Sequence, residues 1–213
     1  MQLTLTTFLT LDGVMQAPGG PDEDRSGEFE DGGWLIPFAD DDMGEIINGI
    51  FEQADAFLLG RKTYGIFAGH WPHVPDDNPV AAALNGRPKY VATTTLESLA
   101  WGNARLLGDD VADEVSKLKA QPGRELQVHG SGHLTQTLMA HHLIDVFRLF
   151  VYPVVLGTGR RLFSHPEAAS AFRLADTRTT RAGMVVLSYQ PAGAPQHGSF
   201  ALDPEPDQHR LLR

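Results

Sequence analysis

The sequence predicts an α/β fold built around a mainly parallel central sheet. Strand-like runs alternate with helix-like segments along most of the 213 residues, and this alternation is typical of a parallel sheet covered by helices. The last two strand-like runs are separated only by a short turn, which predicts an antiparallel pair at one edge of the sheet. The apolar fraction of 42% is ordinary for a globular domain, so we expect a conventional hydrophobic core.

The predicted strands are short runs that are either apolar or alternate between polar and apolar residues. The first alternates threonine with leucine and phenylalanine, and the second is an apolar run that ends at Gly60. Pro153 marks the end of the sixth strand, and Ala182-Gly183 joins the final pair. In chain order, the predicted strands are residues 2–9, 54–59, 88–92, 105–107, 125–129, 144–155, 172–180 and 184–190.

The predicted helices occupy the segments between these strands. The first has apolar residues three and four apart, with Asp41 or Asp42 as its cap. Pro79 suits the first position of the third helix, and Asp109 is the expected cap of the fourth. The predicted helices are residues 43–53, 61–67, 79–84, 111–120 and 133–140.

We expect one domain at residues 1–190 and a C-terminal tail at residues 191–213. The length suits a single domain, and the tail is rich in proline, glycine and charge. An ordered tail would need a surface to hold it, and a partner subunit is the expected one. The connection over residues 10–42 is far longer than usual, and loops of this length are commonly functional lids or partly disordered.

Composition excludes several classes of protein. The chain has no cysteine, so disulfides, thiolate metal sites and a cysteine nucleophile are excluded. A net charge of −10 argues against nucleic acid as a partner. No signal peptide and no apolar segment of bilayer-spanning length is visible, so we expect a cytoplasmic protein without membrane contact. The nine histidines lack acids at ligand spacing, and no metal site is expected.

Three strand ends carry residues suited to a nucleotide. The second strand ends at Gly60, which permits close backbone approach, and the helix after it begins with Arg61, Lys62 and Thr63. The structural alternative for this segment is a surface arginine after a strand-ending glycine.

The other two strand ends are a threonine run and a glycine turn. Thr93, Thr94 and Thr95 offer hydroxyls to a ribose or its 2′-phosphate, although threonine also favours turns and caps. The turn is Gly130-Ser131-Gly132, followed by His133 and Leu134 at the start of a helix. It lacks the full G-x-G-x-x-G pattern, which disfavours a classical Rossmann dehydrogenase.

Four motifs in a fixed order resemble the dihydrofolate-reductase-like superfamily. They are Thr10-Leu11-Asp12-Gly13, then residues 59–64, residues 128–134 and residues 153–159. The closer likeness is to the C-terminal reductase domain of the bifunctional riboflavin-biosynthesis deaminase/reductase and its stand-alone bacterial relatives. One departure is Gly130-Ser131, where the superfamily commonly has two adjacent glycines.

The resemblance implies a three-layer sandwich, NADPH as cofactor and a homodimer. It implies that Gly60, Arg61, Lys62 and Thr63 contact the adenosine-phosphate half of the cofactor. Thr93, Thr94 and Thr95 would flank the 2′-phosphate, and Gly130, Ser131, Gly132, His133 and Leu134 would cradle the pyrophosphate. The substrate would lie near Asp12, Gly13 and Trp34, with Asp12 as the catalytic residue. Asp12-Gly13 is alternatively a simple turn, and Trp34 alternatively anchors the long loop.

Three functions follow from these observations. The leading one is NADPH-dependent reduction of a small heterocyclic or carbonyl substrate by hydride transfer. An alternative is the riboflavin-pathway reduction of 5-amino-6-ribosylaminouracil phosphate, although the acidic first loop counts against a phosphorylated substrate on that side. From another class, the chain could be a non-catalytic protein that binds a nucleotide or a flavin on the same fold.

Overall fold

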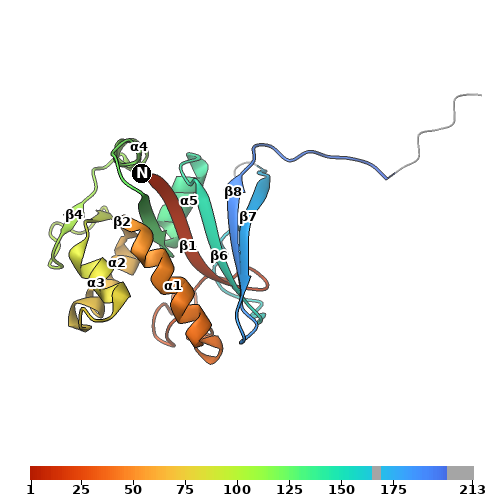
Figure 1. The fold of residues 1–213 in the computed structure, drawn as a ribbon, viewed down its shortest axis with the longest axis horizontal. Helices are drawn as coiled ribbons and strands as arrows, with labels where there is room; N and C mark the ends of the chain where they lie inside the picture. Colours follow the sequence, from red (N-terminus) through yellow and green to blue (C-terminus); the bar gives the residue numbers. More distant parts are fainter. Residues whose placement is uncertain (165–168, 201–213) are drawn as a thin grey trace, which may run out of the picture.

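A computed structural model describes residues 1–164 and 169–200 as an eight-stranded sheet with helices on both faces (Figure 1). The strand order is β4-β3-β2-β5-β1-β6-β8-β7. Strands β1 to β6 are parallel neighbours, and β8 pairs antiparallel with both β6 and β7. The strands are β1 (Gln2–Thr10), β2 (Ala54–Gly60), β3 (Lys89–Ala92), β4 (Ala104–Leu106), β5 (Glu125–His129), β6 (Val146–Tyr152), β7 (Phe172–Thr179) and β8 (Val185–Pro191). The predicted three-layer sandwich with an antiparallel C-terminal edge is confirmed.

The helices divide between the two faces of the sheet. Buried leucines of α4 and α5 pack with β1 and β5 on one face, while α1 and α3 pack in the cores of the other face. Each fully buried leucine stabilises the fold by about 2 kcal/mol. The helices are α1 (Asp41–Gln53), α2 (Arg61–Ala68), α3 (Pro79–Gly86), α4 (Val111–Lys119) and α5 (Gly132–Ala140).

The predicted helix caps were wrong by one or two residues. Asp40, and not Asp41 or Asp42, accepts a hydrogen bond from the N–H of Met43 at the start of α1. Asp110, and not Asp109, accepts from the N–H of Asp113 at the start of α4. In each case neighbouring aspartates compete for one position, and only the backbone angles at the helix start select between them.

A buried polar row crosses the sheet beneath α1. Arg148 of β6 forms a bidentate ion pair with Glu125 of β5, at 2.6 and 2.9 Å. Gln127 donates to that carboxylate and, through its side-chain oxygen, contacts His129 Nε2 at 3.1 Å. The row therefore links two strands that lie on either side of β1.

Two further predictions concern the C-terminal tail and membrane-spanning segments. Residues 192–200 continue past β8, and residues 201–213 of the predicted tail lie outside the described residues. In the part of the chain that the structure describes, no helix combines the length and apolar composition needed to cross a bilayer.

Candidate active site

The three predicted nucleotide-binding segments lie at one edge of the sheet. Strands β3, β2 and β5 are neighbours and run parallel, so their carboxyl ends share one rim. Gly60 at the end of β2 is in register with Ala92 at the end of β3. Ligands of open α/β sheets bind beyond this rim, and we call this part of the protein the carboxyl rim.

Ser131 joins two of these segments directly. Its hydroxyl accepts the N–H of Gly60 at 3.0 Å and donates to the carbonyl of His129 at 2.9 Å. Its own N–H donates to the hydroxyl of Thr63 at 3.2 Å. A Cβ on Gly60 would meet the Cβ of Ser131 at 3.4 Å, an ordinary van der Waals distance, so the two segments pack side by side.

The turn between β5 and α5 is held in an unusual backbone conformation. Gly130 has φ +54° and Ser131 has φ +53°, so two successive residues are left-handed. For serine this conformation costs about 1 kcal/mol, and strain of this kind concentrates at functional sites. The turn directs the first N–H groups of α5 toward the carboxyl rim.

The two helices that directly follow β2 and β5 differ from the other α-helices in their capping. The side chains of Asp40, Asn78 and Asp110 cap α1, α3 and α4. By contrast, α2 begins after Gly60 and α5 after Ser131, and neither has a side-chain cap. Their first N–H groups and the positive ends of their dipoles are available to an anion such as a phosphate.

The side chains around these helix starts differ in availability. Arg61 is exposed and, among the described residues, has no hydrogen-bond or ion-pair partner. Thr94 and Thr95 are exposed, whereas the Thr93 hydroxyl accepts the N–H groups of Thr95 and Leu96 and so caps its own turn. Leu134 is buried, which leaves only its backbone to face a ligand.

Asp12 binds to the loop that follows β6. Its carboxylate accepts the Thr10 hydroxyl at 2.6 Å, the N–H of Gly157 at 2.9 Å and the Arg161 guanidinium at 3.0 Å. These donors, with the Leu156 N–H, hold the pKa of Asp12 well below its usual range. Asp12 is therefore ionised and holds the loop after β6 against the end of β1, and it is not suited to donate a proton. Gly13, with φ +81°, makes the adjoining turn.

The long loop folds back as a strap across the rim, formed by residues 16–34. Asp24 accepts from Lys62 at the start of α2, at 3.2 Å, and forms an ion pair with Arg160 beyond β6. Burial alone would raise the pKa of Asp24, but donors including Ser26, Arg160 and Lys62 hold it well below its usual range. Because β5 and β1 lie between β2 and β6, this contact spans the strand end that carries the glycine turn.

Gln16 and Trp34 fasten the two ends of the strap. The side-chain amide of Gln16 donates to the carbonyls of Asp24 and Ser26 at 3.0 and 2.9 Å. Trp34 is buried, donates its indole N–H to the Gln16 carbonyl at 2.7 Å and meets Tyr152 edge to face. Of the two roles considered for Trp34, this geometry favours an anchor for the loop over a surface for stacking on a ligand.

Sequence reasoning did not single out Gln16, Asp24 or Arg160. Their roles depend on contacts between distant segments, and the only local signal was the long, acidic connection itself. Among the described residues, no group of three or more acids and histidines is placed to hold a metal ion.

A family model described as the RibD C-terminal domain matches residues 1–186. The chain belongs to the RibD C-terminal domain family. The chain is also 30% identical over 191 residues to the uncharacterized protein YyaP of Bacillus subtilis (strain 168), covering 88% of this chain and 94% of YyaP. The uncharacterized protein YwjB of the same organism is 29% identical over 152 residues, covering 70% of this chain and 82% of YwjB.

Solved structures confirm the fold of this RibD C-terminal domain. A putative riboflavin biosynthesis protein from Shewanella sp. PV-4 has a TM-score of 0.68 at 21% identity, covering 90% of this chain and 99% of the other. A diaminohydroxyphosphoribosylaminopyrimidine deaminase/5-amino-6-(5-phosphoribosylamino)uracil reductase from Thermotoga maritima has a TM-score of 0.60 at 15% identity, covering 90% of this chain and 56% of the other. These neighbours bear out the dihydrofolate-reductase-like fold, and the family supports an oxidoreductase.

Proposed function

We propose that this protein is an NADPH-dependent reductase of a small heterocyclic or carbonyl substrate. The observation that carries the proposal is the pair of helices α2 and α5, which begin uncapped at neighbouring strand ends of the carboxyl rim. A dinucleotide presents several phosphate oxygens, and two helix N-termini joined by Ser131 are a fitting cradle for them.

The residues of the rim suit two phosphate groups of the cofactor, the pyrophosphate and the 2′-phosphate. The turn at Gly130-Ser131-Gly132 and the first N–H groups of α5 would hold the pyrophosphate. Arg61 has a guanidinium available for the 2′-phosphate, with the exposed Thr94 and Thr95 nearby on the next strand end. When bound, NADPH supplies a hydride, and the protein orients the acceptor and excludes water.

The charges near the expected substrate position support an unphosphorylated substrate. Two described cations beyond β6 lie toward this end, and each pairs with an acid: Arg161 with Asp12, and Arg160 with Asp24. A phosphorylated substrate would have to compete with these carboxylates for its cations. A small neutral heterocycle or carbonyl compound has no such competition.

Family membership favours a second candidate, a riboflavin-pathway reductase. The RibD C-terminal match extends over residues 1–186, which includes every predicted site residue. Reduction of 5-amino-6-ribosylaminouracil phosphate with NADPH would support this candidate. Turnover restricted to unphosphorylated pterins, pyrimidines or carbonyl compounds would support the leading one.

The cofactor proposal is tested by titrating NADPH and NADH against the protein and an Arg61→Ala variant, using fluorescence and thermal shift. We expect Arg61→Ala to weaken NADPH at least tenfold, or about 1.4 kcal/mol, and NADH by less than about threefold, because only NADPH carries the extra phosphate. Arg178→Ala, on the remote strand β7, is the control and should leave both affinities unchanged. Equal losses for the two nucleotides would contradict the assignment of Arg61, and binding of flavin alone would contradict the reductase.

A further inference from the structure

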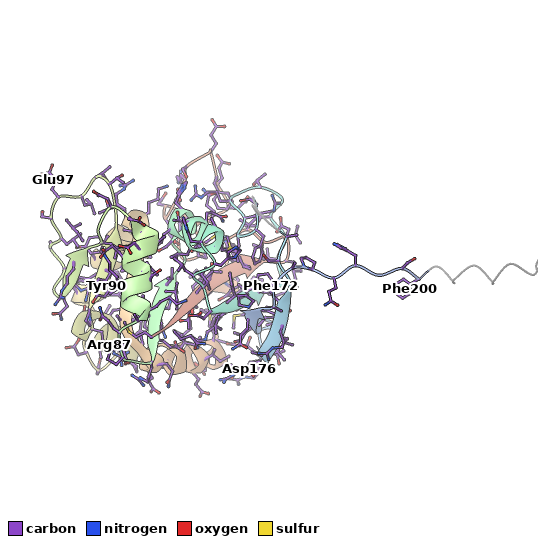
Figure 2. The ribbon with its side chains drawn as sticks, turned by 90° about the horizontal axis from the view of Figure 1, so that it is seen from above. Arg87, Tyr90, Glu97, Phe172, Asp176 and Phe200 are labelled. Atoms are coloured by element: carbon purple, nitrogen blue, oxygen red, sulfur yellow. The ribbon has the colours of Figure 1, made fainter. Side chains whose placement is uncertain are left out.

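The loop that joins β3 to β4 extends to the margin of the protein. It comprises residues 93–103, has no regular secondary structure and carries the exposed Thr94 and Thr95. Figure 2 shows Glu97 of this loop at the outer edge of the molecule. Because the loop lacks strand or helix partners for its backbone, other contacts must hold it in place. We call this segment the β3–β4 loop.

Trp101 fixes the far end of the β3–β4 loop. Its side chain is buried, its indole N–H donates to Asn85 Oδ1 of α3 at 2.9 Å, and its ring centroid lies 4.5 Å from the Lys89 ammonium. Lys89 is itself fully buried and donates to the carbonyls of Leu84 and Arg87. The indole is therefore held between α3 and the start of β3, with a cation against its ring.

The backbone of Trp101 is joined to α2 by the side chain of Tyr64. The N–H of Trp101 donates to the Tyr64 hydroxyl at 3.2 Å, and the two ring centroids lie 6.3 Å apart. Tyr64 is buried and is the fourth residue of α2, so its hydroxyl ties the loop to the helix that begins with Arg61. Leu96 and Leu99 of the loop pack against the apolar cluster that contains Tyr64.

These contacts join the two segments to which the proposed function assigns the 2′-phosphate. Arg61 is on α2, whereas Thr94 and Thr95 are on the loop, so the separation of these groups depends on how the loop is held against the helix. Charge-assisted hydrogen bonds depend on distance and angle, so a shift of the loop would weaken the hold on a phosphate gripped from both sides. Loss of the hydroxyl would favour such a shift, because the buried N–H of Trp101 would be left without its acceptor.

We propose that Tyr64 is a positioning residue that sets the preference of this protein for NADPH over NADH. The inference rests on the proposed function, in which a 2′-phosphate lies between Arg61 and the β3–β4 loop. Tyr64 acts indirectly, because its hydroxyl holds Trp101, and through it the loop, against α2. The turn at Gly130-Ser131-Gly132 follows β5, so NADH, which lacks the extra phosphate, should depend little on this contact.

The inference is tested by titrating NADPH and NADH against a Tyr64→Phe variant, which loses only the hydroxyl. We expect the NADPH dissociation constant to rise about fivefold and the NADH constant to change by less than about twofold, in the range expected for the loss of one hydrogen bond. Hydrogen exchange of amides in residues 93–103, followed by mass spectrometry, should become about tenfold faster in the same variant.

Tyr90→Phe is the matched control. Tyr90 of β3, labelled in Figure 2, packs against the core on the opposite face of the sheet from Tyr64, and its hydroxyl has no hydrogen-bond partner among the described residues. This variant should leave both dissociation constants and the exchange of the loop unchanged.

The possible results separate this inference from the proposed function. Equal changes of the two dissociation constants in Tyr64→Phe would show that Tyr64 only stabilises the domain, and an unchanged NADPH constant would overturn the inference whether or not the loop exchanges faster. A natural chain with equal affinity for the two nucleotides would also overturn it. A natural chain that binds neither nucleotide would contradict the proposed function, and the inference with it.

Discussion

Asp12 illustrates how neighbouring donors determine what a charged residue can do. The sequence presents Asp12 as a polar group at a strand end, suited to contact substrate. In the structure its carboxylate binds the Thr10 hydroxyl, the N–H groups that follow β6 and the Arg161 guanidinium. This residue therefore joins the end of β1 to the loop after β6, and it would influence a substrate chiefly by keeping those two segments in place. Its role as a catalytic residue stays a prediction.

We expect Asp12→Asn to lower turnover by about tenfold while leaving the NADPH dissociation constant within about threefold of the natural value. The amide keeps the size of the side chain but removes the charge that Arg161 needs, and the proposed cofactor contacts follow β2, β3 and β5 instead of β1. Steady-state kinetics on an identified substrate and NADPH titration measure the two effects. Asp176→Asn removes an exposed pair with Arg178 on β7 and serves as the control. An unchanged rate would remove Asp12 from the site.

At the scale of elements, the strap connects parts of the rim that the sheet alone keeps apart. Asp24 contacts the start of α2 on one side and the loop after β6 on the other. The side chain of Asp24 is only 12% exposed, so these contacts are better shielded from solvent than ordinary surface ion pairs. The strap therefore links the start of α2 to the loop after β6.

Removing the charge of Asp24 should loosen the strap. We expect Asp24→Asn to raise the hydrogen-exchange rate of amides in residues 16–34 by about tenfold, because the variant loses both ion pairs that hold the strap down. Exchange followed by mass spectrometry measures this. Asp22→Asn is the matched control, since Asp22 pairs with Arg25 in a solvent-exposed contact within the same loop. Unchanged exchange in Asp24→Asn would show that Gln16 and Trp34 hold the strap without it.

Most elements, but not the strap, could be predicted from the sequence. Strand β5 and helix α1 end where predicted, because apolar periodicity and strand-ending residues are local signals. The parallel direction of β3, β2 and β5 also follows from alternating strands and helices, which is why the nucleotide segments were expected on one rim, whereas the order of the strands comes from the structure. The strap depends on Asp24 meeting Lys62 and Arg160, 38 and 136 residues away. No local pattern encodes such pairings.

At the scale of the whole molecule, the sheet carries the carboxyl rim at one end of its strands and the buried polar row on one of its faces. The row of Glu125, Gln127, His129 and Arg148 lies beneath α1 and holds β5 and β6 together across β1. His129 stacks on Phe51 at 4.5 Å within this row. Its burial, with the nearby charge of Arg148, lowers its pKa to about 3, so the folded protein keeps this imidazole neutral.

This buried histidine should make the folded protein sensitive to mild acid. The unfolded chain takes up a proton at His129 near pH 6.5 and the folded protein near pH 3, so stability is lost as the pH falls between these values. The free energy of unfolding at pH 5 is therefore about 2 kcal/mol lower than at pH 8, because it falls by about 1.4 kcal/mol for each pH unit below 6.5. Burial alone would raise the pKa of Glu125, but the ion pair with Arg148 outweighs burial and lowers it. The contribution of Glu125 to the free energy of unfolding is therefore lost only at lower pH.

Urea unfolding at pH 8, 6.5 and 5 separates these contributions. We expect His129→Gln to flatten the change in stability between pH 6.5 and 5, because glutamine keeps a donor toward Gln127 but binds no proton. The variant and the natural chain can differ in stability at pH 8, because the test compares how steeply the free energy of unfolding of each protein changes with pH. His70→Gln, at an exposed histidine, should keep the natural slope. If His129→Gln lost stability with pH as steeply as the natural chain, the acid sensitivity would have to arise outside the buried row.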